Sequence, residues 1–181
     1  MNTSDLLRRA AIADVRAKGR KLEGYAATFG AEARIGSIRE SIAPGAFRSS
    51  LSAGGDILAL VDHDAGRVLG RTRSGSLRLS EDAKGLAFEL DVPDTQAGRD
   101  VLALAARGDL GGMSFGFTVP KGGDAWFGDR RELRAINLFE ISVVSAWPAY
   151  SGTVVAARAS CAVGAMSLAA AKRHLQARGI I

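Results

Sequence analysis

A serine within an apolar strand pattern is the first residue of this chain that could do chemistry. Residues 113–119 alternate, with apolar side chains on one face and Ser114 and Gly116 on the other. A glycine two residues beyond a serine leaves room for a substrate backbone to approach. The spacing alone more often describes a serine on the solvent face of a strand. Ser114 is therefore a candidate nucleophile that needs a base.

His63 is the candidate base. It follows the apolar run 57–61 and lies between Asp62 and Asp64. A histidine at a strand end beside carboxylates can act as a general base near neutral pH. The same pattern also describes an ordinary turn residue. The local sequence leaves both interpretations open.

Glu140 is the candidate acid. In residues 138–144, Glu140 lies on one strand face with Ser142, and the other face carries Phe139, Ile141 and Val143. A carboxylate inside such a strand needs a partner, because leaving it buried and unpaired costs free energy. Arg131 or Arg134 would be a structural partner, whereas His63 would be a functional one.

Together these three residue types are the parts of an acyl-transfer site. Their chain order, His63 then Ser114 then Glu140, differs from the familiar orders of serine hydrolases. We expect no nucleophile elbow, and therefore no α/β-hydrolase. The chain has one cysteine and two histidines, which excludes a structural zinc site built from these residues. Neither a Walker loop nor a dinucleotide-binding glycine motif is present. We expect no metal and no cofactor.

The elements that must position these residues are mostly strands. Apolar patterns separated by many of the 22 glycines predict strands over 22–29, 35–42, 57–61, 86–92, 113–119 and 132–144. A short helix is predicted over 46–51, a longer one from a cap at Asp94 or Thr95 to Gly108, and a last one over 167–178. The expected fold is mainly β with helices: an antiparallel β-barrel with a packed helix and a C-terminal helical tail.

Charge divides the 181 residues into three parts. Residues 1–21 hold six basic and two acidic residues, and residues 158–181 hold four basic residues and no acid. Because the whole chain is +5, the middle, 22–157, is −3. We expect a basic N-terminal tail (1–21), a β-barrel domain (22–155), and a flexible link with a C-terminal helix (156–181). A slightly acidic core domain argues against nucleic-acid binding.

No apolar run approaches the roughly 18 residues of a membrane span, and the N-terminus lacks a secretory pattern. The pattern therefore favours a soluble intracellular protein. The two tails are expected either to be solvated ends or to provide a docking segment, with 160–181 as the candidate.

A set of ordered motifs resembles a known family. The pieces are Gly24-Tyr25 with Phe29, residues 42–47, Asp62-His63-Asp64, Leu69-Gly70-Arg71, Gly85-Leu86, residues 113–117, and residues 138–144 leading into Pro148-Ala149-Tyr150. Over residues 22–155 the sequence resembles the prohead maturation proteases of tailed phages, which are similar to herpesvirus capsid-assembly proteases.

The resemblance implies a serine endopeptidase on a herpesvirus-protease-like β-barrel. By motif position, His63 would be the base, Ser114 the nucleophile and Glu140 the third member, where the herpesvirus relatives have a second histidine. Asp62 and Asp64 are the alternative acids. The oxyanion donor is left open between a backbone N–H after Gly111 and Gly112, Arg71 and Arg131.

The resemblance also implies a substrate and a location. The substrate would be the scaffold segment of the major capsid protein of a phage or phage-like prohead, with the chain itself as a further candidate. The location would be the cytoplasm of a bacterial host, inside the immature capsid. A homo-oligomer is left open, and no nucleic acid or membrane partner is expected for the core domain. The alternative is a non-catalytic β-barrel component of a capsid assembly, in which Ser114 and His63 are structural.

Overall fold

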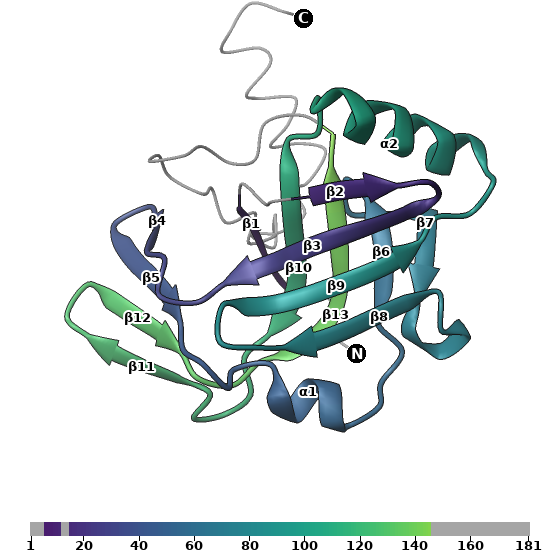
Figure 1. The fold of residues 1–181 in the computed structure, drawn as a ribbon. Coiled ribbons are helices and arrows are strands. Elements are labelled where there is room, and N and C mark those ends of the chain that lie inside the picture. Colours follow the sequence, from purple (N-terminus) through teal and green to yellow (C-terminus); the bar gives the residue numbers. More distant parts are fainter. Residues whose placement is uncertain (1–5, 12–14, 146–181) are drawn as a thin grey trace, which may run out of the picture.

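The computed structural model describes residues 6–11 and 15–145, in which thirteen strands form three sheets and two α-helices pack beside them (Figure 1). The C-terminal helix expected over 167–178 and the domain end expected near 155 lie outside the described residues. None of the described helices is long and apolar enough to cross a membrane.

The first sheet has five strands in the order β1-β10-β13-β6-β7. Its strands are β1 (Leu7–Ala11), β10 (Gly112–Thr118), β13 (Asn137–Val144), β6 (Leu58–Val61) and β7 (Asp64–Arg71). β13 and β6 pair in parallel, and the other three pairs are antiparallel. All three candidate residues lie in this sheet or in the turn between β6 and β7.

The second sheet has four antiparallel strands in the order β2-β3-β9-β8, and it crosses in front of the first in Figure 1. Its strands are β2 (Val15–Lys18), β3 (Lys21–Thr28), β9 (Gly85–Asp91) and β8 (Leu77–Glu81). Contacts of β3 with β10 and of β9 with β7 join the two sheets. The main core fills the space between them, and in it Phe47, Phe115 and Phe117 pack ring against ring.

The third sheet extends to one side of this sandwich (Figure 1). Its order is β11-β12-β5-β4, from β11 (Asp124–Phe127), β12 (Arg130–Leu133), β5 (Ile38–Ile42) and β4 (Ala33–Ile35), with β12 and β5 parallel. The helices are α1 (Arg48–Ser52) and α2 (Gln96–Arg107), with a 3-10 turn at Thr72–Ser74. α2 begins as predicted at a Thr95 cap, whose side chain accepts from the Gly98 N–H, and ends at a left-handed Gly108.

The mainly β class with a packed helix is confirmed, but the closed antiparallel barrel is not found. In the described residues β7 and β8 each pair on one side only, whereas closure requires every edge strand to find a partner. Two of the strand pairs are parallel, so the sheets are mixed.

Two segments predicted as single strands are each divided. Residues 35–42 form the hairpin β4–β5, because Gly36 adopts a left-handed conformation at the turn. Residues 132–144 divide into β12 and β13, which belong to different sheets. Within the first 21 residues, β1 and β2 are paired strands of the folded unit rather than separate from it.

A buried charge network connects the first and third sheets. Glu40 of β5 is 3% exposed and accepts two hydrogen bonds from Arg9 of β1, with Nε···Oε1 at 2.5 Å and Nη2···Oε2 at 2.9 Å. Arg131 of β12 donates to the same carboxylate at 3.2 Å and to Asp124 of β11 at 2.8 Å. Glu40 therefore compensates the charge of two arginines that come from different sheets.

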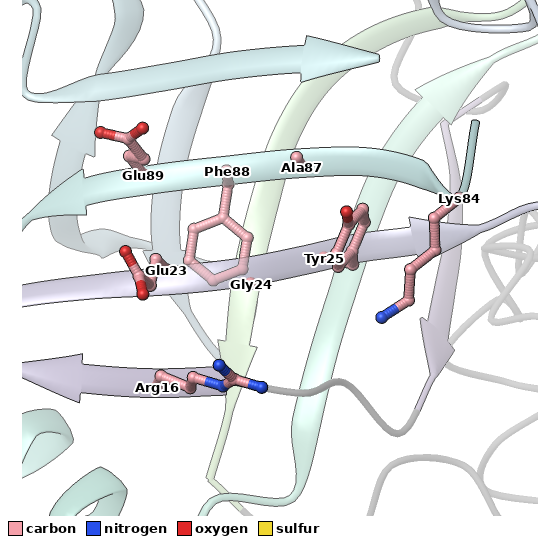
Figure 2. A pocket seen from close by; sticks show the side chains of 8 residues that line it. All are labelled: Arg16, Glu23, Gly24, Tyr25, Lys84, Ala87, Phe88 and Glu89. Atoms are coloured by element: carbon pink, nitrogen blue, oxygen red, sulfur yellow. The ribbon is translucent and has the colours of Figure 1, made fainter. Parts of the chain in front are cut away.

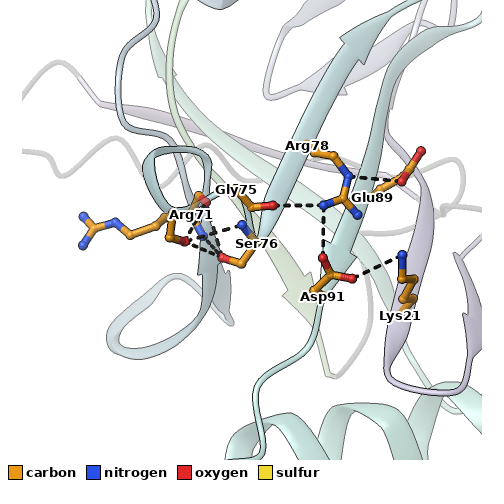
Figure 3. A network of polar contacts seen from close by, with 8 residues as sticks. Lys21, Arg71, Gly75, Ser76, Arg78, Glu89 and Asp91 are labelled. Carbon is orange, nitrogen blue, oxygen red and sulfur yellow. Dashed lines mark hydrogen bonds and ion pairs between the residues drawn. The ribbon is translucent and has the colours of Figure 1, made fainter.

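A second charge network lies on the surface of the second sheet (Figure 3). Arg78 donates to Glu89 at 3.2 Å and to Asp91 at 3.0 Å, and Lys21 forms an ion pair with Asp91 at 3.5 Å. The hydrogen bond from Arg78 lowers the pKa of the Asp91 carboxyl below its usual range. These side chains are solvated, so their ion pairs contribute less to the free energy of unfolding than those of the buried network.

We predict that Glu40→Gln lowers the free energy of unfolding by about 3 kcal/mol, because it leaves the buried Arg9 without a carboxylate and Arg131 with Asp124 alone. The exposed control Glu89→Gln should change it by less than about 1 kcal/mol. Urea unfolding followed by circular dichroism gives both values. Equal losses in the two variants would contradict the assigned role of Glu40.

Candidate active site

His63 is held in a strained two-residue turn between β6 and β7. Asp62 and His63 have φ angles of 51° and 62°, the left-handed region that non-glycine residues rarely adopt. Such a conformation costs about 1–2 kcal/mol per residue. Contacts to the residue that follows β13 offset this cost: the Asp62 carboxylate accepts from Ser145 N at 2.8 Å and Ser145 Oγ at 2.9 Å. The strained turn is thereby fixed beside β13.

The His63 side chain contacts Glu140 directly. His63 Nδ1 lies 2.6 Å from Glu140 Oε1, and both side chains are largely buried. A carboxylate can only accept here, so the contact places a hydrogen on Nδ1 of His63. Nε2, at the opposite edge of the ring, then carries the lone pair of a general base. The structure thus brings together two of the three predicted residues.

Ser142 connects the same two residues and was not singled out by the sequence analysis. Its hydroxyl donates to Glu140 Oε2 at 2.7 Å and accepts the backbone N–H of His63 at 3.1 Å. It is fully buried. The period of two already places Ser142 on the same face as Glu140, and this was the available signal. One hydroxyl therefore fixes both the acid and the backbone of the turn.

Gly116 provides the space for the Glu140 side chain. The two residues are direct partners across β10 and β13. A Cβ atom on Gly116 would lie 2.3 Å from Glu140 Oε1 and 3.0 Å from Cγ. The expectation that Gly116 leaves room for a substrate backbone is thus corrected, because the carboxylate of the acid fills that space.

Ser114 lies on the same sheet face as the His63–Glu140 pair. It is the direct partner of Ser142 across β10 and β13, and side chains of paired residues share a face. Its hydroxyl donates to the carbonyl oxygen of Arg9 in β1 at 2.7 Å, and the residue is 1% exposed. No hydrogen bond joins Ser114 to His63 within the described chain.

Residues 112–116 have the spacing Gly-x-Ser-x-Gly, the pattern of the nucleophile elbow of α/β-hydrolases. Here all five residues lie in the strand β10, which pairs with β1 and β13. The elbow requires a sharp turn from strand to helix, so this is not one.

The other candidates from the sequence have partners away from Glu140. Asp64 accepts from Gly66 N, Arg134 contacts Glu132, Arg131 contacts Glu40 and Asp124, Arg71 contacts Asp56, and Gly111 N donates to Val144 O. Neither Arg131 nor Arg134 is thus the structural partner of Glu140. No cluster of three or more metal-ligating side chains occurs among the residues described.

A hollow of 330 Å³ lies on the second sheet and contains none of the three candidates (Figure 2). Tyr25 donates to Asp82 at 2.6 Å beside it, which raises the pKa of Tyr25 and lowers that of Asp82. Lys84 lies over the Tyr25 ring, 4.3 Å from its centroid. These contacts fix surface side chains, and the residues that line the hollow include no serine, histidine or cysteine.

A serine, a histidine and a carboxylate on one sheet face are the parts of a serine acyl-transfer site. The family model of the caudovirus prohead serine protease matches residues 9–166. The chain therefore belongs to the caudovirus prohead serine protease family, as the resemblance implied. No curated protein and no solved structure matches it. Family membership supports a protease role in capsid maturation, an interaction with the capsid protein, and a location inside the immature capsid.

We predict that Gly116→Ala displaces the Glu140 carboxylate from His63, because the new Cβ would overlap Oε1. The proton on Nδ1 of His63 should lose its downfield resonance in the NMR spectrum. In the control Gly55→Ala, where the added Cβ meets no atom within 4 Å, the resonance should stay. An unchanged resonance in Gly116→Ala would show that Glu140 does not need this space.

We also predict that Ser142→Ala reduces proteolysis by about 10-fold or more, because both the Glu140 carboxylate and the strained turn lose a hydrogen bond. Ser142→Thr keeps the hydroxyl and should restore part of the rate. The exposed serine of β8 supplies the control Ser80→Ala. Cleavage of co-expressed capsid protein, timed on a gel, measures all three. A merely structural Ser142 would lower the unfolding midpoint of Ser142→Ala without slowing cleavage.

Proposed function

We propose that this protein is a serine endopeptidase that cleaves the scaffold segment of its capsid protein, with Ser114 as nucleophile, His63 as general base and Glu140 as the residue that orients His63. The observation that carries the proposal is the 2.6 Å contact between His63 and Glu140 on the sheet face that also carries Ser114. Membership of a serine protease family adds support from outside the geometry.

The reaction divides into two acyl-transfer steps. His63 Nε2 accepts the Ser114 proton as Oγ attacks the carbonyl carbon of the substrate peptide. The same proton then passes to the leaving nitrogen, the C–N bond breaks, and an acyl-enzyme remains on Ser114. Water repeats the sequence: it gives a proton to His63, attacks the ester and releases the new carboxyl end, and Oγ regains its proton.

Glu140 assists both steps by holding Nδ1 protonated and the ring in one orientation. Its negative charge also stabilises the imidazolium that forms when His63 takes the serine proton. A carboxylate in this position supplies a full charge, whereas a second histidine would supply only a neutral acceptor. The two hydrogen bonds at Glu140 use both of its oxygens, which fixes the carboxylate during the reaction.

A non-catalytic structural role is the second candidate, and one observation favours it. Ser114 is 1% exposed and its hydroxyl is hydrogen-bonded to Arg9. A serine in this state has no access to a substrate carbonyl. Under this alternative the capsid protein would be incorporated without being cut, and the chain would remain in the shell as a building block.

Co-expression with the major capsid protein tests the proposal. Ser114→Ala and His63→Ala should each lower cleavage by about 10⁴–10⁶-fold, since members of a catalytic triad act as a unit. Ser80→Ala is the matched control and should cut normally. The size of the capsid protein on a gel gives the result. Normal cleavage by Ser114→Ala would exclude the serine protease mechanism.

The role of Glu140 is tested by comparing two acids near His63. Glu140→Gln should slow cleavage by up to about 10⁴-fold while the unfolding midpoint changes little, because the charge that stabilises the imidazolium is lost. Asp64→Asn should keep most of the activity, since the Asp64 carboxylate accepts from the Gly66 N–H of its own strand β7. The opposite ranking would transfer the orienting role to Asp64.

A further inference from the structure

The Ser114 hydroxyl is covered by the N-terminal strand of its own chain. β1 pairs antiparallel with β10, and Ala10 of β1 lies directly opposite Ser114. The carbonyl oxygen of Arg9 accepts a hydrogen bond from the Ser114 hydroxyl at 2.7 Å, and Ser114 is 1% exposed. Because this hydrogen bond engages the hydroxyl, a substrate carbonyl has to replace the Arg9 carbonyl before Ser114 can act on it.

β1 is an edge strand with few anchors. It lies at one end of the five-stranded sheet and pairs only with β10. Arg9 attaches it to Glu40, and the Arg9 guanidinium also lies 5.5 Å from the Phe117 ring centroid. Leu7 packs partly against the core. Without these two side chains, β1 would be held by the main-chain ladder, the hydrogen bond from Ser114 and the ion pair between Arg8 and Glu140.

β1 also brings a charge to the acid. Arg8 Nε lies 3.8 Å from Glu140 Oε1, the same oxygen that contacts His63. This nitrogen is buried and has no hydrogen-bond partner among the described residues. A cation at that oxygen disfavours the imidazolium that His63 must form, because two positive charges would share one carboxylate. β1 thus opposes the reaction both sterically and electrostatically.

We infer that the outer edge of β10 is the docking surface for an extended segment of the protein substrate, and that β1 occupies this surface as a competing strand. The inference rests on the proposed function, since it takes Ser114 as the nucleophile. The expected partner is an extended polypeptide. Strand addition relies on main-chain hydrogen bonds, which any such segment can supply. The contact from Ser114 to Arg9 shows that a peptide carbonyl in this register reaches the hydroxyl.

Competition between β1 and a substrate strand for the edge of β10 has a quantitative consequence. If β1 is detached in only a fraction of the molecules, the apparent affinity for a substrate strand falls by that fraction. Weakening the anchors of β1 should therefore raise both the affinity for an added strand and the reactivity of Ser114. A full-length chain with a single substitution is sufficient to test this.

The variants are Arg9→Ala, which removes the anchor to Glu40, and Leu7→Ser, which removes the apolar anchor and leaves every charge in place. The control is Arg78→Ala, which removes an arginine from the surface network of Figure 3. Two probes are used on each protein: a fluorescent peptide with the sequence of residues 6–11, read by anisotropy, and a fluorophosphonate that modifies Ser114, read by mass spectrometry.

We expect Arg9→Ala and Leu7→Ser to bind the peptide at least about tenfold more tightly than the wild type and Arg78→Ala, and to be modified at Ser114 at least about tenfold faster. Added peptide should slow that modification. Equal binding and equal modification in all four proteins would overturn the inference and leave the protease proposal standing. Tighter binding without modification of Ser114 in any protein would support the docking surface and reject Ser114 as the nucleophile.

Hydrogen exchange on the wild type keeps the test decisive if either variant fails to fold. An excess of the peptide should speed amide exchange in β1 while β10 stays protected, because one strand replaces the other. Exchange in β1 that remains as slow as in β13 with excess peptide would overturn the inference without any variant.

Discussion

The carboxylate of Glu140 is the constraint on which the site depends, because a buried negative charge in the middle of a sheet must find partners. Its two oxygens accept from His63 and Ser142, and its side chain lies over Gly116. Each of these residues is therefore tied to the presence of the acid. The same hydrogen bonds therefore do two things: they compensate the burial of the Glu140 carboxylate, and they orient the proposed base.

The same constraint accounts for the strained turn. Placing His63 over Glu140 requires two consecutive non-glycine residues at positive φ, a cost of about 2–4 kcal/mol for the pair. Hydrogen bonds from Ser145 to Asp62 and from His63 to Ser142 offset that cost. A relaxed turn would release the histidine from the acid. Strain at this position is thus part of how the proposed base is positioned.

The N-terminal strand β1 controls whether the proposed nucleophile, Ser114, is free to react. The side chain of Arg9 in β1 donates to Glu40, while the backbone carbonyl oxygen of Arg9 accepts a hydrogen bond from the Ser114 hydroxyl. The base and acid are therefore assembled in this structure, whereas the nucleophile is covered. A protease that works inside a shell benefits from cutting late, and a covered nucleophile is compatible with that requirement. The cover comes from the same sheet edge that an extended substrate would use.

The sequence by itself determined the features that depend only on residues close together in the chain. Alternation placed Ser114 and Glu140 on polar strand faces, the Thr95 cap and Gly108 bounded α2, and the ordered motifs indicated the family. Only the tertiary structure decided which strands are neighbours, and strand pairing joins residues far apart in the chain. It therefore divided the expected barrel into three sheets, brought Ser142 and Gly116 to the acid, and placed β1, expected as a basic tail, over Ser114.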